Sequence, residues 1–200
     1  YRPYYVVQQT AALWRTVKPI TLIPLSNVCG AGVELEPLAA KLAGTFRVPC
    51  RIGRETFDVS FALDPERRQY WSTAILQRLA NASSPGERVL GVTACDLYVP
   101  VLTFVFGEAQ LDGNCALVST ARLKEEFYGM PQRKELARER LIKEAVHELG
   151  HTFGLRHCRD WRCVMSSSHA VELLDVKEAG FCTACRRTVF ENGNRPAAAR

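Results

Sequence analysis

Three features are scarce in this 200-residue sequence, and each absence excludes a class of protein. The longest apolar run, near residues 101–106, is far shorter than the ~20 residues of a membrane-spanning helix, so we expect no membrane association. No block of like charge occurs, because 26 basic and 21 acidic residues are spread along the chain, and we therefore expect no nucleic-acid partner. Histidine is also scarce, with four residues in all, so a cluster of histidines is informative.

Length and composition indicate a single globular domain. Apolar residues make up 47% and charged residues 24% of the chain, and these values rule out a disordered protein. No internal repeat or low-complexity linker interrupts it. The densest charged segment, residues 133–144, alternates in sign and therefore predicts a solvent-exposed helix face.

The eight cysteines divide into two groups. Cys29, Cys50, Cys95 and Cys115 are scattered through apolar, strand-like segments, where we expect buried free thiols. The other four lie within 28 residues near the C-terminus. Because a secreted disulfide scaffold has less core and more loop than this chain, the cysteine pattern favours a reducing, intracellular compartment, namely the cytoplasm.

The first 120 residues alternate between strand-like and helix-like patterns, which predicts an α/β domain. We expect strands at residues 20–28, 46–52, 57–62, 89–94, 101–106 and 115–119. We expect one helix at residues 33–42. We expect a second helix that starts at Asp64-Pro65 and ends at a break at residues 83–86, with Trp71, Ile75 and Leu79 on its apolar side.

A long helix is predicted from Pro131 to about Thr152. Proline suits the first helical turn, and apolar residues follow at spacings of four, three and four from Ile142 to Phe153, which indicates a core-facing stripe. Gly154 then stands where a helix ends in a residue that tolerates positive φ.

The composition changes after this helix, so we place a boundary there. Residues 1–154 form the main part of the single domain, residues 155–190 form a cysteine-rich subdomain, and residues 191–200 form a tail. We expect few apolar side chains to hold the subdomain, so metal binding would supply its folding free energy.

The end of the long helix carries the residues with the clearest chemistry. His147 and His151 lie four residues apart and project from one helical face, so both imidazoles can bind one ion. A turn at Gly154 brings His157 back as a third nitrogen ligand, which leaves the fourth position of a tetrahedral zinc open for water. Zinc lowers the pKa of that water to about 7, and Glu148, beside the first ligand, can accept its proton so that hydroxide attacks a carbonyl.

The alternative is that these histidines are ordinary core or surface residues. Three of the four histidines fall within this motif, whereas core histidines would be scattered. We therefore favour the zinc interpretation. The fourth, His169, is interpreted as a surface or structural residue.

The second group of cysteines has the spacing of a structural metal site. Cys158-x4-Cys163 and Cys182-x2-Cys185 suit four thiolates around zinc. The alternatives are a disulfide pair and a redox Cys-x-x-Cys motif, which needs a strand-to-helix context that this segment does not clearly show. Because Cys158 directly follows His157, one peptide bond would join the two zinc sites.

Residues 147–165, with Cys182 and Cys185, resemble the signature of the archaemetzincin family, in which an extended histidine motif is followed at once by Cys, then Cys, Met and Cys-x-x-Cys. The segments at 96–100, 104–109 and 126–129 also resemble archaemetzincin segments, and the resemblance covers roughly residues 20–190. The spacer from Met165 to Cys182 holds 16 residues, one fewer than the family pattern, which leaves the ligand set in place.

This resemblance implies a zinc metallopeptidase of the metzincin clan, with a peptide or protein substrate. It implies a metzincin-like zincin domain with a twisted mixed sheet, an active-site helix and a small C-terminal subdomain stapled by zinc, hence two zinc ions, one catalytic and one structural. Met165 would be the methionine of the Met-turn, an apolar floor beneath the three histidines. Ala116, Leu117 and Val118 would form the antiparallel edge along which an extended peptide docks, although an ordinary hairpin strand is the alternative.

From these residues we expect hydrolysis of peptide bonds by a monomer, through a zinc-bound water activated by Glu148. Two alternatives remain at this point: hydrolysis of a non-peptide amide, and a zinc-stapled binding module with little turnover. The intact Glu148 argues against the binding module, because loss of catalysis would free that position to change.

Overall fold

The computed structural model describes residues 19–26, 34–54, 56–84 and 86–192. A six-stranded sheet lies at the centre, with the strand order β2-β1-β6-β9-β8 and with β3 paired to β1. Its strands are β1 (Ile20–Ser26), β2 (Cys50–Ile52), β3 (Phe57–Asp58), β6 (Arg88–Thr93), β8 (Gly107–Ala109) and β9 (Cys115–Ser119). All pairs are parallel except β8 with β9, so the predicted twisted mixed sheet is confirmed.

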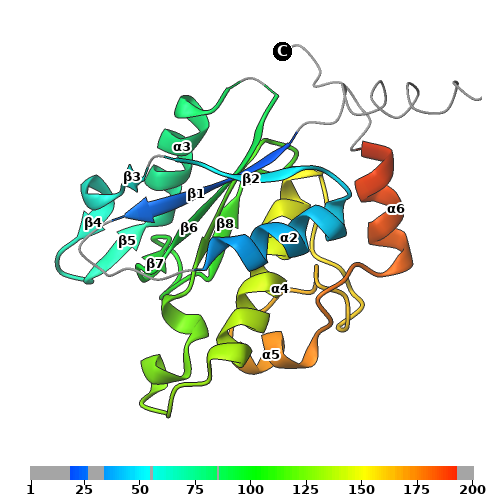
Figure 1. Cartoon of the computed structure of the whole chain (residues 1–200). Helices are drawn as coiled ribbons and strands as arrows, with labels where there is room; N and C mark the ends of the chain where they lie inside the picture. Colours follow the sequence, from blue (N-terminus) through cyan, green and yellow to red (C-terminus); the bar gives the residue numbers. More distant parts are fainter. Residues whose placement is uncertain (1–18, 27–33, 55, 85, 193–200) are drawn as a thin grey trace, which may run out of the picture.

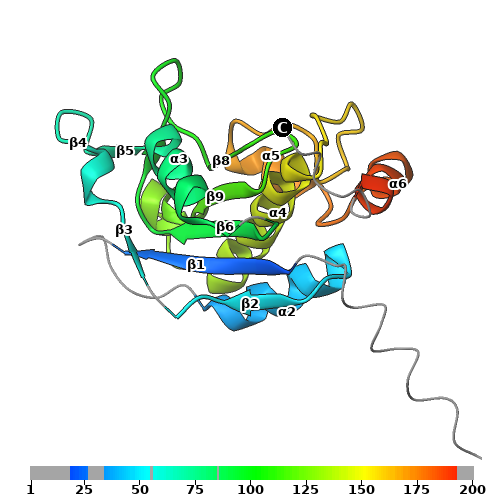
Figure 2. The ribbon, with the colours of Figure 1, turned by 90° about the horizontal axis from the view of Figure 1, so that it is seen from above.

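Helices cover both faces of this sheet, as the α/β pattern predicts (Figure 1). The helices are α2 (Leu35–Phe46), α3 (Ser72–Ala82), α4 (Lys134–Thr152), α5 (Val171–Val176) and α6 (Thr183–Asn192), with 3₁₀ turns η1 (Ser60–Ala62), η2 (Ala121–Leu123) and η3 (Glu125–Tyr128). Figure 2 shows β1, β6 and β9 side by side in the centre, with α6 on the side far from α3. No helix in the described part of the chain is long and apolar enough to cross a membrane.

The core divides into two layers because strand side chains alternate between the two sheet faces. In β9, Ala116 and Val118 pack in the cluster that holds α2 and α4, whereas Cys115 and Leu117 pack in the cluster that holds α3. The side chains of β6 alternate between the two faces in the same way, and every residue of this strand from Val89 onward is buried. This central position explains why both strands were recognisable as nearly continuous apolar runs.

The expected strand at residues 101–106 is wrong. Val101 is 88% exposed and Leu102 is 52% exposed, and only Val105 makes an isolated antiparallel bridge, to Leu97. Leu97 belongs to β7 (Leu97–Tyr98), which forms a second, three-stranded sheet with β4 (Leu63–Asp64) and β5 (Gln69–Trp71). The apolar run is a loop, and hydrophobicity alone does not distinguish a loop beside a cleft from a buried strand.

The helix expected to start at Asp64-Pro65 begins instead at Ser72. The Asp64 carboxylate accepts hydrogen bonds from the backbone N–H groups of Glu66 and Arg67, so it stabilises the turn between β4 and β5 rather than a helix start. Two other expected strands are shorter than predicted: Phe46 is the last residue of α2, leaving β2 at Cys50–Ile52, and residues 57–62 contain β3 followed by η1.

Two expectations about α4 and the segment after it are also corrected. Helix α4 begins at Lys134, three residues after Pro131, and the expected exposed face is only partly correct, because the charged residues from Arg133 to Glu139 are exposed whereas Arg140, Lys143 and Glu144 are buried. The residues after Cys158 contribute several apolar side chains to the same core as α2 and α4. These are Val164, Met165, Val171, Leu174, Phe181 and Val189.

The scattered cysteines fit the expectation of free thiols in part. Cys115 is a buried free thiol and Cys95 is buried, whereas Cys50 is only half-buried, and Cys29 lies outside the described residues. The last two residues of the strand expected at residues 20–28 also lie outside them.

Candidate metal centres

The last turns of α4 bring three histidines together. His147 and His151 lie one helical turn apart, and their Nε2 atoms are 3.1 Å apart. Gly154 adopts a φ of 83°, which turns the chain after the helix and returns His157 to the same point. One ligand nitrogen from each histidine lies within 4.8 Å of the others. We call these residues the three-histidine cluster.

Backbone carbonyl groups orient two of these imidazoles. The Nδ1 of His147 lies 2.8 Å from the carbonyl oxygen of Val164, and the Nδ1 of His151 lies 2.7 Å from that of Leu155. Because a carbonyl oxygen can only accept, both Nδ1 atoms carry the proton, and each Nε2 keeps a free lone pair toward the other histidines.

The three-histidine cluster suits a zinc ion. Burial lowers the pKa of each of the three histidines, most strongly for His147, and so favours the neutral imidazole that binds metal. Nitrogen ligands about 2.0 Å from one tetrahedral zinc would lie roughly 3.3 Å apart, close to the 3.1 Å separation of the two Nε2 atoms. The donor atoms and their spacing therefore fit zinc.

Glu148 follows the first histidine and is almost completely buried. Burial raises the pKa of its carboxyl well above the ordinary value, and the nearby carboxylates of Glu144 and Glu108 raise it further, whereas the Lys177 ammonium lowers it. A carboxyl group raised in pKa beside a metal-binding cluster has the property needed in a general base.

A cleft of about 850 Å³ opens onto these residues. It is lined by the three-histidine cluster, Glu148, all of β8, residues 102–106 and residues 167–169. His169 is exposed, as a surface histidine would be, but it lies in the wall of this cleft, and it is outside the three-histidine cluster. Sequence spacing alone did not indicate this position, because a loop carries His169 back to the cleft.

The edge strand at this cleft is β8, and the expectation that Ala116, Leu117 and Val118 form it is wrong. These three residues lie in β9, which pairs with β6 on one side and β8 on the other, and they have no exposed surface. Strand β8 (Gly107–Ala109) is antiparallel, lies at the end of the sheet and lines the cleft. Three residues of ordinary polarity carry no recognisable strand pattern, so the sequence did not reveal it.

Met165 packs directly against the active-site helix. Its side chain is fully buried, and a Cβ atom added at Gly150 would lie 2.4 Å from the Met165 sulfur. The absence of a side chain at Gly150 therefore lets the methionine approach the helix between the first two histidines.

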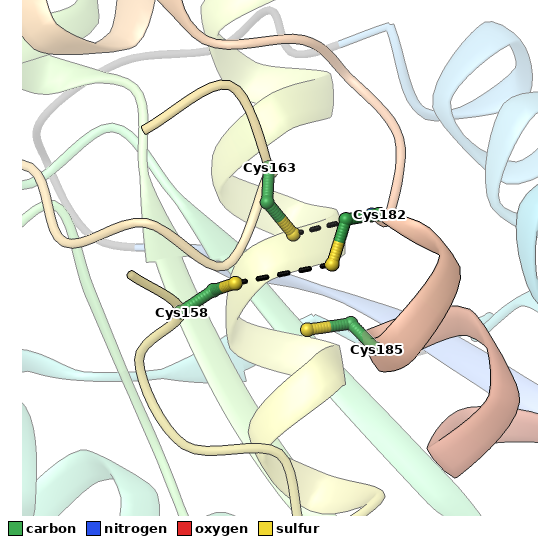
Figure 3. A group of neighbouring side chains, drawn as sticks. All are labelled: Cys158, Cys163, Cys182 and Cys185. Atoms are coloured by element: carbon green, nitrogen blue, oxygen red, sulfur yellow. Dashed lines mark hydrogen bonds between the residues drawn. The ribbon is translucent and has the colours of Figure 1, made fainter. Parts of the chain in front are cut away.

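The four cysteines near the C-terminus also come together, and we call them the four-cysteine cluster (Figure 3). They are Cys158, Cys163, Cys182 and Cys185. Their sulfur atoms lie within 4.8 Å of one another, and all four are free thiols. The Sγ atoms of Cys158 and Cys182 are 3.9 Å apart, close to the roughly 3.8 Å expected for two thiolates 2.3 Å from one tetrahedral zinc. The backbone N–H of Cys182 also donates to the Cys163 sulfur over 3.3 Å.

This arrangement suits a zinc ion better than a two-cysteine redox site. The Cys182-x2-Cys185 pair stands at the start of α6 and shares its space with two further thiols. Backbone N–H donation lowers the pKa of Cys182, whereas burial raises the pKa of Cys163 and Cys185. A bound cation would hold buried thiolates in their charged form.

Backbone hydrogen bonds join the two clusters. The N–H of Cys158 donates to the carbonyl of Met165 over 2.9 Å, and the N–H of Val164 donates to the carbonyl of Gly180 over 3.0 Å. Val164 in turn accepts the hydrogen bond that orients His147. The loop from Cys158 to Met165 thus contributes to both clusters.

Comparisons with known proteins agree with this geometry. The model of the family described as "Peptidase family M54" matches residues 60–191, which include both clusters. The archaemetzincin of Methanocaldococcus jannaschii is 44% identical over 133 residues, covering 66% of this chain and 73% of that protein. The crystal structure of an archaemetzincin from Methanopyrus kandleri superposes with a TM-score of 0.77 at 32% identity, covering 95% of this chain and 100% of that one. The crystal structure of a zinc-dependent peptidase from Methanocorpusculum labreanum superposes with a TM-score of 0.76 at 31% identity, covering 85% of this chain and 99% of that one.

Proposed function

Because the chain belongs to peptidase family M54, the archaemetzincin family, and is a zinc metallopeptidase, we propose that it cleaves peptide bonds in the cleft beside the three-histidine cluster. His147, His151 and His157 hold the catalytic zinc, and Glu148 is the general base. The observation that carries this proposal is the meeting of three neutral imidazoles, a buried carboxyl and an exposed strand edge in one cleft.

The residues around the three-histidine cluster have different roles in the proposed reaction. A zinc ion in the three-histidine cluster supplies Lewis acidity to the reacting carbonyl and water when it is bound. Glu148 takes the proton of the attacking water and later delivers it to the leaving amine, a transfer suited to its raised pKa. The carbonyls of Val164 and Leu155 hold the two helix histidines in the orientation and tautomer that ligation needs.

The substrate is an extended peptide or protein segment that pairs with β8. This strand ends the sheet, so its outer backbone N–H and C=O groups are available for pairing. Because β8 lines the same cleft as Glu148, a peptide paired with it passes the base and the metal ligands.

The four-cysteine cluster holds a second, structural zinc, and residues 155–190 form a small subdomain organised around that ion. Support comes from the sulfur spacing and from the loop shared with the histidine cluster. The chain then carries two zinc ions with different roles.

Incubation with a peptide library, read by mass spectrometry, tests the proposal. We expect the zinc-loaded protein to cleave peptide bonds, and Glu148→Ala to lower the rate at least ~10²-fold while both zinc ions stay bound. Glu139→Ala is the matched control, because Glu139 is an exposed carboxylate on the same helix, and its rate should be unchanged.

Each contrary result has a clear meaning. Unchanged turnover in Glu148→Ala contradicts the role of the base. Failure of the zinc-loaded protein to cleave any peptide bond, together with cleavage of a small amide, indicates an amidohydrolase. Failure to cleave either substrate indicates a binding module.

A further inference from the structure

Strand β8 contains a glycine whose Cβ position lies against the Glu148 side chain of α4. A Cβ atom added at Gly107 would lie 2.6 Å from Cγ and 2.8 Å from Oε1 of Glu148. Non-bonded carbon and oxygen atoms do not approach this closely, so the Glu148 side chain occupies the space that any other residue at position 107 would need.

We propose that Gly107 is a positioning residue for catalysis: its missing side chain allows the Glu148 carboxylate to lie directly against the strand that binds the substrate. The inference rests on the proposed function, because it assigns Glu148 as the base and β8 as the peptide-binding edge. It adds a residue whose effect on the base is exerted through the Glu148 side chain.

A glycine in this position has a stability cost that calls for a reason. Glycine weakens strands, since it loses more backbone entropy on folding and offers no side chain to pack. Strand glycines commonly mark a point where another group approaches the backbone closely. Here the approaching group is the one carboxylate that the proposed mechanism needs.

The helix cannot move away to make room for a larger residue. Next to Glu148, Val146 and Leu149 on α4 have no exposed surface and pack in the main core. A methyl group at position 107 would therefore displace the flexible Glu148 side chain rather than the helix. The three nearest atoms to that methyl group belong to Leu117 and Glu148, and none belongs to a histidine.

Steady-state kinetics of Gly107→Ala provide the first test. A displacement of about 1 Å in a catalytic group can lower a rate by ~10²-fold. We expect kcat to fall between ~10- and ~10²-fold, with KM changed less than about twofold and with zinc content unchanged. Gly44→Ala is the matched control, because a Cβ at Gly44 meets nothing within 4 Å, and its kinetics should equal those of the wild type.

A structural effect would look different. The same Cβ at position 107 would lie 2.5 Å from the carbonyl oxygen of Leu117 in β9, so the substitution also strains the pairing of β8 with β9. Loosening of β8 weakens peptide binding and raises KM, whereas displacement of the base lowers kcat. A rise in KM with unchanged kcat overturns the proposal.

A thermal-unfolding cycle decides the question even if Gly107→Ala is inactive or poorly stable. Gly107→Ala is compared with wild type, and the double variant Gly107→Ala/Glu148→Ala with Glu148→Ala alone. In the second pair the added methyl group meets no carboxylate, although it still meets the Leu117 carbonyl oxygen, so we expect the loss of Tm in this pair to be smaller than in the first pair. Equal losses overturn the proposal. Because this cycle needs no turnover, its failure is distinct from failure of the peptidase function, which the peptide library reports.

Discussion

At the scale of single residues, the catalytic centre depends on partners that come from distant parts of the chain. The histidine spacing was readable in the sequence because a helix places residues i and i+4 on one face. The carbonyls of Val164 and Leu155, the glycine at 107 and the cleft-lining His169 were not readable, because the return path of the chain after Gly154 determines which groups they meet. Met165 was expected beneath the histidines from the family resemblance alone.

The contact between Gly150 and Met165 leads to a prediction about stability. A Cβ at Gly150 would lie 2.4 Å from the Met165 sulfur and 3.3 Å from the Phe181 ring, in a fully packed region. Although alanine favours helices by about 1 kcal/mol over glycine, overpacking costs typically 1–3 kcal/mol. We expect Gly150→Ala to lower the free energy of unfolding in urea by up to about 2 kcal/mol.

The control for this prediction is another helical glycine. Gly44 in α2 has open space at its Cβ position, so Gly44→Ala should add no clash. The higher helix propensity of alanine should then raise the free energy of unfolding by up to about 1 kcal/mol. If both alanine substitutions stabilise the protein, Met165 does not pack tightly against the helix.

At the scale of elements, the fold was predicted best where strands and helices are buried in the centre. Strands β6 and β9 and the long helix α4 follow from apolar runs and an apolar stripe. The loop at 101–106 was misread because its apolar side chains line the cleft or face solvent. The turn at Asp64 was misread because aspartate accepts hydrogen bonds from backbone N–H groups in turns as well as at helix starts.

The charged face of α4 was misread in part, for a related reason: the charges in its later turns have partners that only the fold provides. The Nε and Nη2 atoms of Arg140 each lie 2.7 Å from a carboxylate oxygen of Asp175 in α5, and Lys143 donates to the carbonyl of Leu174. The Lys177 ammonium lies 3.1 Å from the Glu144 carboxylate and also donates to the carbonyl of Ser166. These contacts fasten the C-terminal segment to the active-site helix.

The Lys177–Glu144 pair supports a prediction at this scale. Both side chains are buried, so Lys177→Met would leave the Glu144 charge without its partner. Removal of one partner of a buried pair costs about 3–5 kcal/mol, whereas replacement of both by apolar groups is often nearly neutral. We expect Lys177→Met to destabilise strongly in urea unfolding and Glu144→Leu/Lys177→Met to recover most of the loss.

Lys134→Met, at an exposed position of the same helix, serves as the control and should change little. An equally large loss in the double variant would show that the pair does not act through its charge.

At the scale of the whole molecule, the two clusters share one core and one loop. The sequence predicted which histidines and which cysteines come together, because spacing along the chain defines both groups, but it underestimated the packing around the cysteines. Val164, Leu174 and Val189 are buried in the cluster that includes α2 and α4, so apolar contacts hold this segment in the core. Loss of the structural ion should therefore loosen residues near the four-cysteine cluster while α5 stays packed.

Metal analysis provides a prediction for the whole chain. Protein purified without chelator should contain two zinc equivalents, one in each cluster. Cys182→Ser should lower the content to one while leaving the histidine site loaded. A reproducible value of one in the wild type, with Cys182 and Cys185 found as a disulfide, would reject the structural site.

The most direct test of the central claim, that the three-histidine cluster holds a separate catalytic ion, is a chelator titration. Activity, zinc content and hydrogen exchange are followed in the same samples. The three-histidine cluster has neutral ligands and an open position, whereas four thiolates bind zinc more tightly, so the first equivalent lost should come from the histidines. We predict that activity falls with this first equivalent while exchange protection around residues 158–185 persists, and that protection falls only at higher chelator. Activity that survives loss of the first equivalent, or loss of protection before loss of activity, would contradict the account.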